Sequence, residues 1–510
     1  METLPNLQID QPCSLFNSTC SNLQQIYHYL PGSSFLLRYI KNSYQNDPVR
    51  VVLELFLVFF ALKYLLSKKY NIENNDVQLT EEEVDELVDD WQPEPLVPSL
   101  SNSEREMLDN VPITVGPPGT RQKMRNGKTL VNMAAFNFLG FLGNETLKTE
   151  AVRTLRKYGV GSCGPPGFYG TLDVHKLLER DIANFLGTED AIIYSQGFST
   201  VSSVIPAYAK RGDMIVCDEG ANFAIQKGIQ ISRSRVRYFK HNDMNDLERV
   251  LENIIREDAI EKRPLTRRFI VTEGLSLNYG DIVPLKKLVE LKHAYKFRII
   301  LDESLSFGVF GKRGAGVTEH FGVPIEDIDL LIGSMCHALT SSGGFCAGSK
   351  EIIDHQRLSG LAYTFSASLP AILAVCAREG LSILQKQSQV LATLRNNVAT
   401  FRSIAAMIPA ISLGETSDAS PILHIRIHND VVDKLDLSPK DQEKKLQEIV
   451  HEVNRDGFLI TRAMYVPDQE LFLPKPSIRI CISAAHTKRE VEKAANSIRA
   501  AVHKVLGKCK

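Results

Sequence analysis

Short apolar runs alternate with stretches of helical length through the middle of the chain, and this alternation limits the folds that the chain can adopt. The apolar runs read DAIIYS (190–195), DMIVCD (213–218), RRFIVTEG (267–274), FRIILDE (297–303) and DLLIGS (329–334). Stretches of helical length, such as 174–186 and 285–296, lie between them. Strands that alternate with helices form a mostly parallel sheet that is covered on both faces. The sequence therefore predicts an α/β domain that binds ligands beyond the carboxyl ends of its strands.

The pattern changes after about residue 405. Strand-like PILHIRIH (421–428) and PSIRICIS (476–483) flank a helical stretch near 440–456, and a final helix is predicted over about 487–506. This order is typical of a separate α+β domain, and 510 residues are too many for one small core. The predicted organisation is an N-terminal segment (1–47), a membrane anchor (48–68), an amphipathic helix with a proline-rich connector (69–104), a large domain (105–405) and a small C-terminal domain (406–510).

The anchor is predicted from the run VVLELFLVFFALKYLL at 51–66. A membrane-spanning helix needs about 20 apolar residues, with roughly 17 as the lower limit. The run is slightly short and contains Glu54 and Lys63, so a buried or interfacial amphipathic helix is the alternative. We expect a single membrane-spanning helix, with Lys63 extending its ammonium group toward an interface.

Composition excludes several classes of function. The net charge is −1, which gives no global electrostatic case for binding nucleic acid. The nine cysteines include no C-x-x-C pair, so neither a metal site nor a disulfide framework is expected, and a reducing compartment is the better expectation for most of the chain. Between 70 and 90 the chain is acidic and helical in pattern, with Thr80 as N-cap and Glu83 completing a capping box.

Four motifs carry the chemistry. Their sequences are YGVGSCGPPGFYGT (158–171), IILDESLSFGVFG (299–311), LIGSMCHALTSSGGF (331–345) and PSIRICISAAH (476–486). The glycines and prolines of the first motif indicate a close-packed loop at unusual dihedral angles. Cys163, Phe168 and Tyr169 within it favour a site or an interface over a surface turn. In the second motif Asp302 follows a buried strand, where a carboxylate is costly unless it is paired.

Together the four motifs resemble those of the α-oxoamine synthases, which are pyridoxal-phosphate (PLP) enzymes that condense an amino acid with an acyl-CoA. The resemblance runs from about residue 126 to the C-terminus, and stretches such as WQPEPLVP, NFLGFL and FSASLP narrow it to the first long-chain-base subunits of serine palmitoyltransferases. It implies a PLP-dependent transferase fold of type I. Such a fold has a large domain with a mostly parallel sheet and a smaller α+β domain, here preceded by one N-terminal transmembrane helix.

Three positions depart from the catalytic members of this family. The lysine that forms the imine with PLP in those members falls at His337 here, and imidazole has no primary amine. Two histidines of their sites fall at Asn222 and Leu305. Asp302 and Arg479 remain, at positions that the family uses for the pyridinium nitrogen and the substrate carboxylate, as structural or vestigial groups. The resemblance thus implies no catalytic residue in this chain.

Because the family works as dimers with sites at the subunit interface, the resemblance implies a heterodimer with a catalytic subunit whose lysine binds PLP covalently. This chain is then a required non-catalytic subunit of serine palmitoyltransferase, which condenses L-serine with palmitoyl-CoA to 3-ketosphinganine in the first step of sphingolipid biosynthesis. Cys163, Phe168 and Tyr169 are expected to shape the partner's site. The hydroxyl of either Thr364 or Ser366 is expected to meet the phosphate of the partner's PLP.

The substrates suggest a location. Acyl-CoA is found in the cytosol and the ketone product partitions into membranes, so we expect a single-pass protein of the endoplasmic reticulum membrane with its large domain in the cytosol. Small membrane subunits that activate or regulate the complex are further expected partners. Two alternatives stay open: a self-sufficient PLP-dependent acyltransferase that uses another lysine, and a scaffold or regulator that contributes nothing to an active site.

Overall fold

The computed structural model describes residues 48–67, 79–414 and 416–507, together with the isolated positions 35, 38, 39 and 42. The chain divides into two compact units, Met1–Arg105 and Glu106–Lys510. Most of the predicted N-terminal segment (1–47) and the first part of the predicted acidic helix (70–90) lie outside the described residues.

The first unit contains the helices α3 (Pro48–Leu66) and α4 (Glu81–Asp90), and α5 (Asn102–Asp109) begins in it. The capping box predicted at the start of α4 is present. The backbone N–H of Glu83 donates to Thr80 Oγ1 at 3.3 Å, and the N–H of Thr80 donates to Glu83 Oε2 at 2.8 Å. These hydrogen bonds to Thr80 hold the pKa of Glu83 below its usual value and fix the start of the helix.

The prediction of a transmembrane helix at 48–68 is not supported. The segment is helical over α3, but among the described residues no helix is long and apolar enough to cross a membrane. Three charged residues, Arg50, Glu54 and Lys63, lie within the 19 residues of α3, and Arg50 Nε donates to Glu54 Oε1 at 2.9 Å. Charged groups are costly in hydrocarbon, and the prediction gave these three too little weight.

A seven-stranded sheet forms the centre of the second unit. Its strands follow the order β3 (Asp190–Tyr194), β9 (Gly344–Gly348), β8 (Leu330–Ser334), β7 (Arg298–Asp302), β6 (Arg268–Glu273), β4 (Met214–Asp218) and β5 (Arg235–Phe239). From β8 to β5 each strand is parallel to its neighbours, whereas β9 is antiparallel to both β3 and β8. The predicted mostly parallel sheet is therefore confirmed, and the carboxyl ends of its parallel strands meet at one edge.

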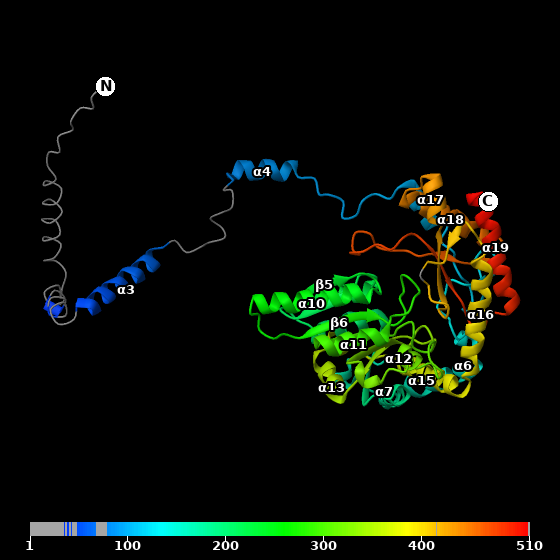
Figure 1. The fold of residues 1–510 in the computed structure, drawn as a ribbon, viewed down its shortest axis with the longest axis horizontal. Coiled ribbons are helices and arrows are strands. Elements are labelled where there is room, and N and C mark those ends of the chain that lie inside the picture. The colour runs from blue at the N-terminus through cyan, green and yellow to red at the C-terminus, as the bar shows by residue number, and fades with distance from the viewer. Residues whose placement is uncertain are drawn as a thin grey trace, which may run out of the picture. The chain divides into compact units, whose positions relative to one another are not determined.

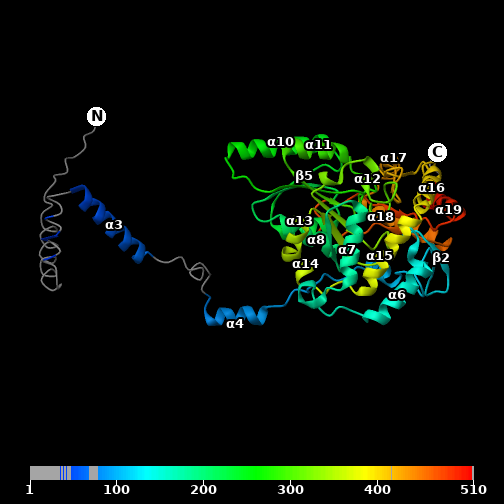
Figure 2. The ribbon, with the colours of Figure 1, turned by 90° about the horizontal axis from the view of Figure 1, so that it is seen from below.

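Helices cover both faces of this sheet, because its side chains alternate between two cores. In β3, Ala191 and Ile193 belong to one core, and Ile192 and Tyr194 belong to the other. The first core includes α6 (Glu145–Tyr158), α7 (Asp173–Leu186), α10 (Met244–Ile260), α11 (Leu285–Tyr295), α12 (Val317–Phe321) and α15 (Ala371–Lys386). The second includes α8 (Gly197–Tyr208), α9 (Phe223–Ser232), α13 (Lys350–Ser359) and α14 (Leu361–Thr364). Within the first group, α10 and α11 lie next to each other (Figure 2).

The C-terminal part of the unit holds an antiparallel sheet. Its strands are β10 (Ile411–Ser412), β11 (Ile422–Ile427), β14 (Ile478–Cys481) and β13 (Thr461–Arg462), in that order. The helices α16 (Gln389–Ala405), α17 (Asn429–Leu435), α18 (Pro439–Arg455) and α19 (Lys488–Leu506) gather at this end of the unit (Figure 1). A short third sheet joins β1 (Arg121–Lys123), β2 (Thr129–Asn132) and β12 (Phe458–Leu459). This is an α+β arrangement, while the boundary placed at residue 405 stays a prediction.

A half-buried histidine joins two carboxylates beside the ends of β4 and β5. His241 Nδ1 lies 2.7 Å from Asp218 Oδ1, and His241 Nε2 lies 2.9 Å from Asp281 Oδ1. Burial lowers the pKa of His241, but the hydrogen bonds and charges of the two carboxylates outweigh burial and raise this pKa to about 10. The charged ring thus ties β4 to the turn that contains Asp281.

We expect His241→Gln to lower the melting temperature near neutral pH and to have a smaller effect at pH 10. The folded-state pKa of His241 lies above its ordinary value of 6.5, so the charged ring stabilises the fold fully below that value. The stabilisation is lost as the pH rises through the folded-state pKa. Thermal unfolding of both chains at pH 6, pH 8 and pH 10 measures the difference, and an equal loss at all three would contradict a charged His241.

Candidate functional site

A cavity of about 250 Å³ lies where the carboxyl ends of the parallel strands meet. Glu273 and Asp302 are the last residues of β6 and β7, and both line this strand-end cavity. Four of the predicted site positions come together in it, namely Asn222, Asp302, Leu305 and His337. They belong to three segments that are far apart in the sequence, at or just after the ends of β4, β7 and β8, and they meet because these strands lie in one sheet.

Asn222 joins the two buried carboxyl groups of the strand-end cavity. Its Nδ2 donates to Asp302 Oδ2 at 3.0 Å and to Glu273 Oε1 at 2.9 Å, and its backbone N–H donates to Glu273 Oε2 at 3.1 Å. Its Oδ1 accepts the N–H of Ile225 at 3.1 Å and caps the N-terminus of α9. Asn222 is therefore held on both sides of its amide, by the sheet edge and by the helix.

Burial raises the pKa of both carboxyl groups. Burial and then the charge of Asp302 raise the pKa of Glu273 to about 8, against the hydrogen bonds from Asn222 and Leu277. Burial also raises the pKa of Asp302, against hydrogen bonds from Ser304 and Asn222. Burial thus disfavours charge on both groups, and the amide of Asn222 donates to each of them.

The ring of His337, predicted to occupy the position of the family's lysine, lines the strand-end cavity. Its Nδ1 lies 2.8 Å from the carbonyl oxygen of Ser304, so this nitrogen carries the proton and donates it. Burial lowers the pKa of His337, which keeps the imidazole neutral. Phe136 packs edge-to-face on the ring, with centroids 5.1 Å apart, and the guanidinium of Arg479 lies 4.5 Å from the Phe136 centroid. Arg479 is not among the described residues that line the strand-end cavity and packs against Phe136, which does line it.

The residues around the strand-end cavity do not fit PLP as a covalently held cofactor. No lysine is among the described residues that line it. Asp302 already accepts the N–H of Ser304 and the amide of Asn222, each at 3.0 Å, so a pyridine nitrogen would compete with Asn222 for this carboxylate. Leu305 is buried and offers no polar group.

The glycine-rich loop (158–171) exposes the three residues predicted to contact a partner. Phe168 is 67% exposed, and Cys163 and Tyr169 are exposed as well. Cys163 and Tyr169 have φ angles of 53° and 65°, which residues other than glycine rarely adopt. Backbone strain of this kind persists only where surrounding contacts impose it. That these side chains meet a partner stays a prediction.

The glycine-rich loop is hydrogen-bonded to the other predicted partner-facing segment, the serine stretch (363–370). Ser162 Oγ donates to the carbonyl oxygen of Ser368 at 2.7 Å. The backbone N–H of Ser368 donates to the carbonyl oxygen of Gly164 at 2.9 Å, and the Ser368 hydroxyl donates to the same oxygen at 3.2 Å. The structure therefore joins two segments that the sequence singled out separately.

The hydroxyls of Thr364 and Ser366 lie in different surroundings. Ser366 is exposed, whereas Thr364 Oγ1 is buried and has no hydrogen-bond partner among the residues that the structure describes. Of the two, Ser366 is therefore the one whose hydroxyl a second chain can reach. Neither residue lines the strand-end cavity.

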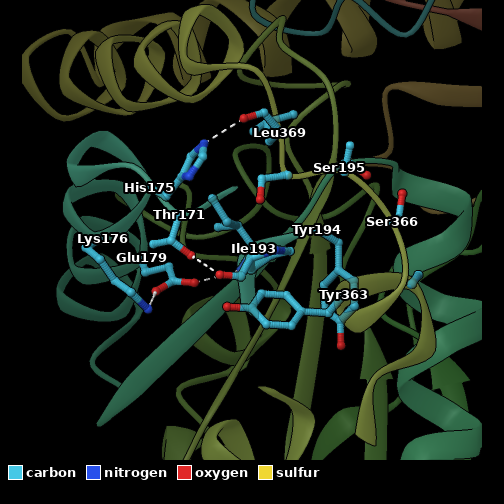
Figure 3. A pocket seen from close by; sticks show the side chains of 14 residues that line it. Thr171, His175, Lys176, Glu179, Ile193, Tyr194, Ser195, Tyr363, Ser366 and Leu369 are labelled. Atoms are coloured by element: carbon cyan, nitrogen blue, oxygen red, sulfur yellow. Dashed lines mark hydrogen bonds and ion pairs between the residues drawn. The ribbon is translucent and has the colours of Figure 1, made fainter. Parts of the chain in front are cut away.

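A second cavity, of about 20 Å³, lies against the serine stretch (Figure 3). Thr171 from the glycine-rich loop, His175 and Glu179 from α7, Tyr194 from β3 and Ser366 line it. It shares no lining residue with the strand-end cavity. The predicted residues thus form two groups, one inside this chain and one at its surface.

Glu273 and His175 are not among the residues predicted from the sequence. Glu273 ends an apolar strand in the same way as Asp302 does, and this shared pattern could have indicated that Glu273 lies at the same edge of the sheet. His175 and Glu179 are four residues apart on α7, a spacing that places them on one face of a helix. Nothing in the sequence indicated what that face contacts.

Residues 128–498 match the family model of aminotransferase class I and II. The chain is similar to long chain base biosynthesis protein 1c of Oryza sativa subsp. japonica, with 43% identity over 87% of this chain and 89% of that protein. It is also similar to serine palmitoyltransferase 1 of Saccharomyces cerevisiae, with 36% identity over 93% of this chain and 92% of that protein.

Solved structures of more distant proteins share the fold. A serine palmitoyltransferase from Sphingomonas wittichii superposes with a TM-score of 0.70 at 23% identity, over 79% of this chain and 96% of that chain. A serine palmitoyltransferase solved with a PLP internal aldimine has the same TM-score and identity, over 80% of this chain and 97% of that chain. At this level of identity the likeness confirms the predicted α/β fold of PLP-dependent transferases.

Proposed function

The chain belongs to the aminotransferase class I and II family, among long chain base biosynthesis protein 1 and serine palmitoyltransferase 1 chains, and we propose on this basis that it acts in sphingolipid base synthesis. We propose further that it is the non-catalytic subunit of a heterodimeric serine palmitoyltransferase. A lysine-bearing partner then holds PLP and condenses L-serine with palmitoyl-CoA to 3-ketosphinganine.

The observation that carries this proposal is the strand-end cavity, which has the position of a cofactor site and lacks its chemistry. The imidazole of His337 has no primary amine with which to form an imine, and burial keeps the ring neutral. Its Nδ1 is already occupied, because it donates to the carbonyl oxygen of Ser304. The side-chain amide of Asn222 donates a hydrogen bond to the carboxyl group of Asp302, so a cofactor nitrogen would have to compete with it. These two features disfavour the first alternative, a self-sufficient acyltransferase.

The contribution of this chain to the partner's site is proposed to come from its surface. PLP bound by the partner supplies the electron sink for the condensation. The exposed hydroxyl of Ser366 can donate to an anionic phosphate oxygen, which is a strong kind of hydrogen bond. Cys163, Phe168 and Tyr169 are exposed on the loop that is bonded to the serine stretch, and they form one wall of the site in this proposal. This arrangement favours a working interface over the second alternative, a plain scaffold.

We also propose that the complex works at the endoplasmic reticulum membrane with its large domain in the cytosol. The proposal rests on substrate chemistry, because palmitoyl-CoA is supplied from the cytosol and the product partitions into lipid. Digestion of sealed microsomes with an external protease tests it. Protection of the second unit would contradict a cytosolic location.

The proposal predicts that tagged chain co-purifies with a lysine-bearing PLP protein and that only the pair condenses serine with palmitoyl-CoA. The chain alone is expected to show no condensation and no visible absorbance from bound PLP, because the part of the strand-end cavity's lining that the structure describes contains no lysine. A serine/palmitoyl-CoA assay with and without the co-purified partner measures this. Activity from the isolated chain would contradict the proposal, and an active partner that gains nothing from this chain would favour the scaffold.

A further inference from the structure

We propose that His175 is a positioning residue, which holds the serine stretch in the place that the partner's site requires. The inference rests on the proposed function, since it concerns how Ser366 is presented to a second chain. His175 lies on α7, is only 4% exposed, and touches neither a proposed substrate nor the strand-end cavity.

His175 connects α7 to the end of the serine stretch. Its Nε2 lies 2.6 Å from the carbonyl oxygen of Leu369, and the backbone N–H of Leu172 donates to its Nδ1 at 3.0 Å. Because Nδ1 accepts, Nε2 must carry the proton and donate to Leu369. Figure 3 shows the bond from His175 to Leu369. Leu172 is the residue before α7 and follows the glycine-rich loop, so one imidazole joins the end of that loop to the serine stretch.

The start of the serine stretch, at Tyr363, is also linked to α7, through Arg357. Glu179, one turn after His175, receives the guanidinium of Arg357 at 3.1 Å and 3.2 Å. Arg357 Nη1 in turn lies 3.3 Å from the hydroxyl oxygen of Tyr363. Glu179 is only 4% exposed, so both of these anchor points on α7 are buried.

Ser366 lies between these two attachment points, at Tyr363 and Leu369. The cavity beneath it has about 20 Å³, which is room for roughly one water molecule. The exposed hydroxyl of Ser366 therefore belongs to a short segment that is fixed at both ends and has little free space beside it. A segment held in this way presents its hydroxyl at low entropic cost, which a mobile loop does not.

The test uses the full-length chain in complex with its lysine-bearing partner. We expect His175→Leu to lower kcat roughly ten-fold to a hundred-fold, with the KM for serine changed less than two-fold, because a displacement of about 1 Å can cost about a hundred-fold. The PLP concentration at half-saturation is expected to rise about ten-fold, because a hydrogen bond to a charged phosphate is weakened. His175→Gln should recover most of both values, since its amide can still donate to Leu369.

Two further variants keep the outcome interpretable. Tyr363→Phe removes only the hydroxyl that meets Arg357, and we expect a smaller loss of PLP affinity in the same direction. His451→Gln replaces an exposed histidine of α18 and is expected to change nothing. An active wild-type complex in which His175→Leu and Tyr363→Phe both keep normal kcat and PLP affinity overturns the inference. A wild-type pair without activity contradicts the proposed function instead.

Discussion

Replacing Gly170 with alanine is expected to lower the activity of the heterodimer about a hundred-fold, the loss that a displacement of about 1 Å at a site can cause. A Cβ atom at Gly170 would overlap the carbonyl oxygen of Gly164 and come within 2.6 Å of the carbonyl oxygen of Pro165. Both are backbone atoms, so the loop itself must move. The Gly164 oxygen is the acceptor for Ser368, and the serine stretch must therefore shift with it.

The effect should appear in the activity of the complex and also in the stability of the chain, because Gly170 is buried while Phe168 and Tyr169 of the same loop are exposed. Condensation rate, PLP affinity and melting temperature of the complex are the measurements. Gly143→Ala is the control, since a Cβ there meets nothing within 4 Å and its φ is ordinary. Full activity of Gly170→Ala would show that the glycine-rich loop has no part in the site.

A heterodimer whose partner has lost its lysine should lose activity by roughly a thousand-fold or more, and His337→Lys in this chain should not restore it. The new amine would lie beside Asp302, whose carboxylate is engaged by Asn222. Leu305 would still fill the place of a site histidine with apolar atoms. A lysine at position 337 alone would therefore leave Asp302 engaged by Asn222 and position 305 without a polar group.

This second prediction is checked by condensation rate and by the visible absorbance of PLP bound through a lysine. The matched control is the same complex with the lysine of the partner intact, where His337→Lys should leave activity in place. Recovery of condensation by His337→Lys in the lysine-less complex would mean that the strand-end cavity is still a working cofactor site.

The parts of the fold and site that could be predicted follow from strand order. The resemblance implied that Asn222, Leu305 and His337 belong to one site, and all three line one cavity because each follows a parallel strand of the same sheet. The capping box of Thr80 and Glu83 was predictable because its contacts lie within four residues.

The parts that could not be predicted depend on contacts between distant segments. The bond from His175 to the carbonyl of Leu369 spans most of the large domain in sequence, and a backbone oxygen leaves no mark in a residue pattern. The choice between Thr364 and Ser366 required knowing which hydroxyl is buried. The predicted membrane anchor is not supported, since among the described residues no helix is long and apolar enough to cross a membrane, and α3 carries three charges.

The hydrogen bonds of the Asn222 amide also affect which substitutions could restore a catalytic site in this chain. Removing it would leave Glu273 and Asp302 as buried groups without their shared donor, a change that costs a few kcal/mol in typical proteins. A reversal toward catalysis would have to pass through that destabilised intermediate and change His337 and Leu305 as well. In the proposed heterodimer, the loss of Asn222 would therefore lower the stability of this chain before any activity could return.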